Sequence, residues 1–229
     1  MTDEQIIPDV TSLTVGVLGG TGAQGAGLAL RWASAGIEVL IGSRDAERAA
    51  EAATRIRGLV PHSRVSGVAN AECAERSDIV VIAVPWDAHE KTLIGVADHL
   101  VGKILVDCVN PLGFDKQGPF VLDVAEGSAA QQAAALLPET RVTGAFHNVS
   151  AVLLDDAALS PVDTDVLVLG EKKADTDLVQ ALAETIEGVR GVYGGRLRNS
   201  AQVEALTANL IAMNRRYKGH AGIRITGGP

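Results

Sequence analysis

The stretch TVGVLGGTGAQGAGLALRWA, residues 14–33, decides the fold of this chain. Its first part, 14–20, is a run of apolar and small residues that predicts a buried strand. The Ala- and Leu-rich part that follows predicts a helix over 23–35. The glycines between the two have the spacing G-x-G-x-x-G. Because this spacing follows a strand and opens a helix, it indicates a βα unit whose tight turn requires glycine.

Strand-like and helix-like segments alternate over the rest of the first 150 residues. Apolar strand segments are expected at 37–41, 63–67, 78–84, 103–109 and 141–146. Helices are expected between them, at 45–57, 70–76, 87–100 and 128–137. Continuous apolar strands that alternate with helices pair in parallel through right-handed crossovers, and helices cover both faces of the sheet. The predicted fold class is therefore α/β, a Rossmann-like doubly wound parallel sheet.

The segment after residue 150 has a different pattern. A strand is expected at 164–170, a helix at 177–189, and a last helix from about 199 to 217 with one apolar face. That face suits core packing, a pocket wall or a dimer contact. We expect three parts: an N-terminal extension (1–12), a Rossmann-like domain (13–150) and a small α-rich C-terminal lobe (151–229).

Charge and cysteine content argue against several classes of protein. The 229 residues carry a net charge of −8, which argues against binding to nucleic acid or to anionic membranes. No apolar run reaches the roughly 20 residues that span a bilayer, and the acidic start MTDEQIIPDVTS lacks the features of a signal peptide. Cys73 and Cys108 have no metal-ligand spacing. We expect a cytoplasmic protein with reduced thiols, no metal, no membrane contact and no nucleic-acid partner.

The glycine loop predicts a dinucleotide phosphate site. In this motif Gly20 permits the tight turn, Gly22 lets the backbone approach a pyrophosphate, and Gly25 allows close packing of helix on strand. Free amides at the start of the helix, aided by the helix dipole, then hold the phosphates. The alternative is a Gly-rich turn that binds no ligand.

The end of the second strand predicts which dinucleotide is bound. A protein selective for NAD places Asp or Glu there, whereas this chain has Gly42, Ser43 and Arg44. Arg44 can pair with a 2′-phosphate, Ser43 can donate a hydroxyl, and Arg48 lies one helical turn further on. The nearest acid, Asp45, is better placed to cap the next helix. These residues favour NADP, and a solvated surface pair of arginines is the alternative.

The ends of the later strands offer few groups for acid or base chemistry. His147 is the one imidazole that follows a strand, and Asp107 lies inside a strand, where a structural and a functional role are equally open. The other histidines, His62, His89, His99 and His220, are expected at the surface. An alcohol dehydrogenase needs a general acid or base, but direct hydride exchange between two bound cofactors needs only juxtaposition. The sequence therefore favours the second kind of reaction.

Several segments together resemble the coenzyme F420-dependent NADP oxidoreductase family, from about residue 14 to 225. They are VGVLGGTGAQGAGLALRWA, VLIGSRDAERA, VIAVPWDAH, the NP of VDCVNP, GAFHNVSA and LRNSAQVEALTANLIAMN. The resemblance implies a homodimer with a small C-terminal lobe, and NADP(H) and coenzyme F420 as cofactors. It also implies a direct, reversible hydride transfer between reduced 8-hydroxy-5-deazaflavin and NADP+, for which no catalytic residue is required.

The resemblance also implies roles for individual residues. The phosphates would lie against a loop formed by Gly20, Thr21, Gly22, Ala23, Gln24 and Gly25, and the 2′-phosphate against Ser43, Arg44 and Arg48. The nicotinamide half would lie along Val84, Pro85, Asn110, Leu112 and Ala151. The deazaflavin would lie against His147, Val149, Leu206 and Ala221. Ser150 stands where a familiar family member has proline.

Two other functions fit parts of the pattern. One is an NADPH-dependent reductase of the same fold that acts on an imine, a flavin or a ferric acceptor. Residues 195–220 are too few for the longer helical dimer domain of pyrroline-carboxylate reductases. The other is an NADP(H)-binding redox sensor without turnover. The segments VPW and FHN at strand ends, with a second lobe to complete a pocket, favour an enzyme.

Overall fold

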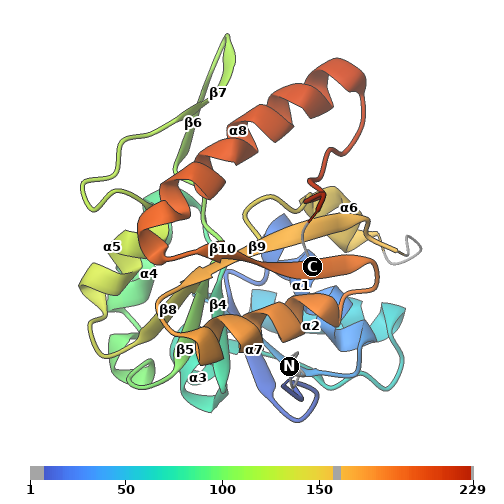
Figure 1. Ribbon diagram of the computed structural model, residues 1–229. Helices are drawn as coiled ribbons and strands as arrows, with labels where there is room; N and C mark the ends of the chain where they lie inside the picture. The colour runs from blue at the N-terminus through green and yellow to red at the C-terminus, as the bar shows by residue number, and fades with distance from the viewer. Residues whose placement is uncertain (1–7, 157–160, 228–229) are drawn as a thin grey trace, which may run out of the picture.

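The computed structural model describes residues 8–156 and 161–227, so that 1–7 of the expected N-terminal extension lie outside the described residues. Within them, eight strands form one sheet with the order β10-β9-β8-β5-β4-β1-β2-β3 (Figure 1). These strands are β1 (Thr14–Leu18), β2 (Glu38–Ser43), β3 (Val65–Ala69), β4 (Ile79–Ile82), β5 (Ile104–Asp107), β8 (Arg141–Gly144), β9 (Thr164–Gly170) and β10 (Val189–Gly195).

The sheet is doubly wound. Between β3 and β8 every pair of adjacent strands is parallel, and the chain order reverses at β1, which pairs with β2 on one side and β4 on the other. Such a reversal leaves a crevice at the carboxyl ends of the strands, where ligands of α/β proteins bind. The predicted Rossmann-like α/β class is confirmed.

The helices lie on both faces of this sheet. They are α1 (Ala23–Ser34), α2 (Ala46–Leu59), α3 (Asn70–Arg76), α4 (His89–Ile94), α5 (Ala129–Leu136), α6 (Ala151–Asp155), α7 (Lys173–Glu184) and α8 (Ser200–Tyr217). Side chains of α1, α2, α6 and α7 share one buried apolar cluster, and those of α3, α4 and α5 share the other. Successive strand residues alternate between the clusters: Ile79 and Val81 belong to the first, and Val80 and Ile82 to the second. The continuous apolar strands therefore serve two cores.

Some element boundaries differ from the sequence prediction. The prediction of a single helix over 87–100 is wrong, because α4 ends at Ile94 and a short 3₁₀ turn lies on either side of it. The helix expected at 177–189 is α7, which begins and ends earlier. Gly188 (φ +86°) reverses the chain after it, and Val189 then begins β10. A hairpin of β6 (Leu112–Asp115) and β7 (Gly118–Val121) was not predicted.

The segment after residue 150 extends the main sheet as well as adding helices. β9 runs antiparallel to β8, and β10 is parallel to β9. α8 then lies beside the β6-β7 hairpin, away from the body of the sheet (Figure 1). The chain returns from α8 toward the start of β9, where the Ile223 carbonyl accepts a hydrogen bond from the Asp165 amide.

The buried carboxylate of Asp165 anchors this returning segment. It accepts hydrogen bonds from the guanidinium groups of Arg190, at 2.6 and 2.7 Å, and Arg224, at 2.7 Å. It also accepts the amide of Ile225. These bonds, that of Arg190 first, hold the pKa of Asp165 well below its usual range. The end of the described chain is thereby fixed to the sheet.

Candidate functional site

The loop between β1 and α1 leaves no room for larger residues. Gly19 has φ +78°, a conformation that favours glycine. A Cβ on Gly25 would lie 2.7 Å from the Gly19 carbonyl oxygen and 2.8 Å from Gly20 Cα, so only glycine lets α1 start this close to the strand. Gly22 precedes α1 without a capping side chain. The first amides of the helix are thus available to an external acceptor.

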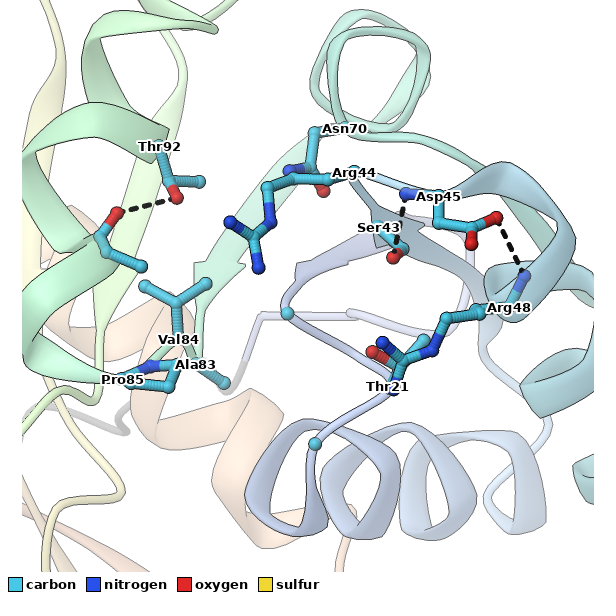
Figure 2. Close-up of a pocket in the computed structure, with 13 residues that line it drawn as sticks. Thr21, Ser43, Arg44, Asp45, Arg48, Asn70, Ala83, Val84, Pro85 and Thr92 are labelled. Carbon is cyan, nitrogen blue, oxygen red and sulfur yellow. Dashed lines mark hydrogen bonds between the residues drawn. The ribbon is translucent and has the colours of Figure 1, made fainter.

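A cavity of about 540 Å³ lies between this loop and the ends of β2 and β4 (Figure 2). It is lined by Gly19, Thr21, Gly22, Ser43, Arg44, Asp45, Arg48, Asn70, Ala83, Val84, Pro85, Ala88 and Thr92. Arg44 and Arg48 extend into it from the two sides of the β2–α2 connection, and Thr21 faces them from the loop (Figure 2). The sequence analysis singled out eight of these residues, and the fold brings them together at one cavity. They are Thr21, Gly22, Ser43, Arg44, Asp45, Arg48, Val84 and Pro85.

Local hydrogen bonds leave the donors of this cavity available. Asp45 Oδ1 accepts the amides of Glu47 and Arg48, at 3.0 and 3.3 Å, which confirms its predicted role as the cap of α2. Ser43 Oγ accepts the Asp45 amide at 3.2 Å, so its own proton can be donated to a ligand. Within residues 8–156 and 161–227, neither Arg44 nor Arg48 forms a salt bridge with an acid. The cavity therefore presents two guanidinium groups and a hydroxyl to an anion.

A second cleft of about 380 Å³ adjoins the first at the end of β4, where both are lined by Ala83, Val84 and Pro85. It is also lined by Gln24, Trp86, Asp87, Cys108, Val109, Asn110, Leu112, Phe114, Thr207 and Ile211. These residues come from α1, the ends of β4 and β5, the β6-β7 hairpin and α8. Asp87 is the one charged side chain of this lining. Burial raises the pKa of the Cys108 thiol, which therefore stays protonated.

The turn that follows β8 is held in a strained conformation beside this cleft. Phe146 has φ +63°, which is rare for a bulky side chain and typically costs about 1–3 kcal/mol. Its buried ring packs edge-on against Trp32, with centroids 5.6 Å apart. Its carbonyl accepts a hydrogen bond from Gln24 Nε2 at 3.1 Å. The next carbonyl, of His147, accepts Asn110 Nδ2 at 3.1 Å and Thr207 Oγ1 at 2.8 Å.

Comparison with known proteins identifies the family. Residues 14–111 match the family described as NADP oxidoreductase coenzyme F420-dependent. The F420-dependent NADP reductase of Methanothermobacter marburgensis is 42% identical over 224 residues, which cover 95% of this chain and 100% of that protein. The chain belongs to the coenzyme F420-dependent NADP oxidoreductase family. The family resemblance that the sequence motifs indicated is thus confirmed.

Two further relatives agree with this family assignment. The F420-dependent NADP reductase of Methanocaldococcus jannaschii is 36% identical and is matched over 98% of its length by 93% of this chain. The crystal structure of a candidate F420-dependent NADP reductase from Arthrobacter sp. FB24 superimposes with a TM-score of 0.79. That protein is 26% identical, and the match covers 94% of this chain and all of the other.

In this member of the F420-dependent NADP oxidoreductase family, His147 is buried beneath the turn. Its side chain is 2% exposed, and neither ring nitrogen has a hydrogen-bond partner among the described residues. Burial lowers the pKa of His147 to about 4, against a smaller opposing effect of the Asp107 charge. The imidazole is therefore neutral at physiological pH, and its ring does not line either cavity.

The expectation that His89 lies at the surface was wrong. His89 is fully buried, and its Nε2 donates to Asp107 Oδ2 at 2.7 Å while Nδ1 lies 2.9 Å from Gln132 Oε1. Burial lowers the pKa of His89, but the hydrogen bond to Asp107 and the charge of Asp107 together outweigh this effect. The net pKa of His89 is therefore raised above its ordinary value. Asp107 also accepts the Val109 amide at 2.9 Å. These contacts show a structural role for Asp107.

Glu204 on α8 is a buried acid that sequence analysis did not single out. Its carboxylate accepts the amides of Ala129 and Ala130, at 2.9 and 3.2 Å, at the first turn of α5. Burial raises its pKa to about 7. The sequence indicates its burial only by its position, one residue after Val203 on the apolar side of a predicted helix. Glu204 joins the start of α8 to α5.

The remaining predicted site residues lie around the two cavities. Those that line neither cavity are Gly20, Ala23, Gly25, His147, Val149, Ala151, Leu206 and Ala221. Val149 is buried and Ala151 begins α6, whereas Leu206 is half-buried on α8 and Ala221 lies on the segment that follows it. In the described part of the chain, no group of three or more His, Cys, Asp or Glu side chains could hold a metal. No described helix is long and apolar enough to cross a membrane.

Proposed function

We propose that this protein transfers a hydride directly and reversibly between reduced coenzyme F420, an 8-hydroxy-5-deazaflavin, and NADP+. One observation carries the proposal beyond family membership: a cavity that presents two guanidinium groups meets, at the end of β4, a cleft whose only charged lining side chain among the described residues is Asp87. A dinucleotide held by its phosphates in the first can place its other end in the second. The activity belongs to the reductases that are 36% and 42% identical to this chain.

The donors of the first cavity fit NADP. Arg44, Arg48 and the Ser43 hydroxyl would hold the 2′-phosphate, because none of them has an acidic partner in the described structure. Thr21, Gly22 and Ala23 would present the loop to the pyrophosphate, where the free amides of α1 stabilise negative charge. Asp45 is held by the helix that it caps and is therefore not available to ribose hydroxyls.

The second cleft fits two rings that react by juxtaposition. Val84, Pro85, Asn110 and Leu112, which line this cleft, would face the nicotinamide. The family resemblance adds Ala151, the first residue of α6, to this set. When the nicotinamide of NADP+ accepts a hydride from the reduced deazaflavin, the deazaflavin also gives up one proton, which passes to solvent. The protein therefore has to align the two rings and needs no proton acceptor of its own. His147, Val149, Leu206 and Ala221 would support the deazaflavin. His147 would position the deazaflavin, because its buried and neutral imidazole is a poor acid.

The proposal also assigns roles to the two parts of the chain. Residues 13–150 would bind NADP, while 151–229 complete the deazaflavin pocket and form a homodimer contact. We place the protein in the cytoplasm, and its net charge of −8 argues against a nucleic-acid partner. Light scattering during size-exclusion chromatography tests the dimer directly. An imine, flavin or ferric acceptor, or a sensor without turnover, is not favoured by the relatives.

The deciding experiment mixes purified protein, NADPH and oxidised deazaflavin. We expect the visible absorption band of the oxidised deazaflavin to disappear at the rate at which NADPH is consumed, and to return when NADP+ is added to the reduced form. NADH is the matched control and should react much more slowly. Consumption of NADPH with free flavin or an imine, but none with the deazaflavin, would contradict the proposal. Tight binding of NADPH without turnover of any acceptor would indicate a sensor.

A further inference from the structure

Side chains from three separate parts of the chain hold the strained turn 146–149. Trp32 and Gln24 belong to α1, Asn110 follows β5, and Thr207 lies on α8. They contact the Phe146 ring, the Phe146 carbonyl and the His147 carbonyl. A bulky residue keeps φ near +63° only where its surroundings determine that conformation. These contacts from distant segments are therefore what determines the conformation of the turn.

Gln24 is the member of this set that lies nearest to the first cavity along the chain. It is the second residue of α1, two residues after Gly22, which lines that cavity. Its side chain points away from that cavity and lines the second cleft. There its side-chain amide donates a hydrogen bond of 3.1 Å to the carbonyl of Phe146, which lies 122 residues further along the chain. The family resemblance would place Gln24 at the phosphates, whereas the side-chain geometry points to the turn.

We propose that Gln24 is a positioning residue that couples the two cofactor sites. A phosphate bound at the loop fixes the first turn of α1, and thereby fixes the position of the Gln24 side-chain amide. The side-chain amide then holds the Phe146 carbonyl, which keeps the turn 146–149 in its strained conformation beside the second cleft. Dinucleotide and deazaflavin should therefore each tighten the binding of the other, by the same factor in both directions. The proposal rests on the proposed function for the identity of the second ligand.

The test measures this factor in complexes that cannot react. NADP+ and oxidised deazaflavin have no hydride to exchange, so the dissociation constant of each can be measured by calorimetry with and without the other. We expect each ligand to tighten the other by about fivefold or more in the unmodified protein. Gln24→Met keeps the length of the side chain and removes the donor. In this variant the factor should fall to within about twofold of unity, while NADP+ alone binds within about threefold of normal.

A matched control separates affinity from coupling. Arg48→Gln weakens NADP+ at the far end of the first cavity and, at saturating NADP+, should keep the coupling factor of the unmodified protein. Retention of the factor in Gln24→Met, or its absence in the unmodified protein, would overturn the proposal. A tenfold or larger loss of NADP+ affinity in Gln24→Met would also overturn it, because Gln24 would then be a phosphate ligand.

Hydrogen–deuterium exchange tests the same link without the second ligand. In the unmodified protein, NADP+ should slow exchange in the peptide containing 19–25 and also in the peptide containing 146–150. Gln24→Met should keep the first protection and lose the second. Equal protection of both peptides in the variant would refute the link. Failure of the unmodified protein to bind deazaflavin would refute the proposed function, and the exchange result would still decide the role of Gln24.

Discussion

Replacing Arg44 by Gln should weaken NADP(H) and leave NAD(H) almost unchanged. The guanidinium group extends into the first cavity, and no acid in the described structure competes for it (Figure 2). A ligand phosphate would therefore gain this donor without the cost of breaking an existing salt bridge. NAD(H) has no 2′-phosphate and loses nothing when the donor is removed. The substitution thus tests the identity of the bound nucleotide as well as the location of its phosphate.

The expected size follows from the chemistry of the contact. A hydrogen bond to a charged group is worth about 1.5–3 kcal/mol, and about 1.4 kcal/mol corresponds to a tenfold change in affinity. The loss for NADP(H) should therefore lie between about tenfold and a hundredfold. Arg44 is exposed, so salt screens the contact and the lower half of this range applies at physiological ionic strength. Arg44→Gln combined with Arg48→Gln should lose more than either variant alone.

The assay is titration of NADPH and NADH, followed by nicotinamide fluorescence, at low and at physiological salt. Arg55→Gln is the matched control, because Arg55 also lies on α2 but pairs with Asp155 outside the cavity. It should leave both affinities unchanged. Equal losses of NADPH and NADH affinity in Arg44→Gln would refute the 2′-phosphate assignment. A loss for NADPH that does not shrink as salt rises would refute the electrostatic reasoning.

Three further results are expected. Gly25→Ala should lower the thermal unfolding temperature and weaken NADP+, because its Cβ would meet loop backbone at 2.7 Å, whereas Gly58→Ala meets nothing within 4 Å and should be tolerated. Replacing Glu204 by Gln should remove a loss of stability that the unmodified protein shows between about pH 4.5 and 7. In that range the folded state, in which Glu204 has a pKa of about 7, binds more protons than the unfolded state. The free energy of unfolding of both proteins, measured with denaturant at several pH values, would contradict this if the difference between the two proteins did not change with pH. His147→Ala should mainly raise the apparent Michaelis constant for deazaflavin in steady-state assays, and loss of turnover at saturating deazaflavin would assign His147 to the chemistry instead.

The parts of the fold that sequence predicted are those determined locally. Apolar runs such as 78–84 and 103–109 are buried on both faces, so their strand character was evident from composition alone. The glycine loop and the cap at Asp45 follow from backbone requirements of a few neighbouring residues. Ser43, Arg44 and Arg48 lie together because they span the short connection from the end of β2 to the first turn of α2.

The parts that sequence missed depend on contacts between distant segments. In the sequence, His89 is a polar residue on a short helix. Only the hydrogen bond to Asp107 on β5 makes burial of its imidazole favourable. The hairpin β6-β7 and the strand β10 are stabilised by pairing that a local pattern does not reveal. The positive φ of Phe146 is against the preference of every bulky residue, so no propensity could have indicated it.

The anchoring of α8 has a consequence for how the second cleft recognises its ligand. Glu204 fixes the start of the helix to α5, and Arg224 and Ile225 fix the segment after it to Asp165. Thr207 and Ile211, which lie between these anchors, line the cleft. A wall held at both ends loses little conformational entropy when a ligand binds. A ligand of this cleft would therefore meet a wall whose shape is set before it binds.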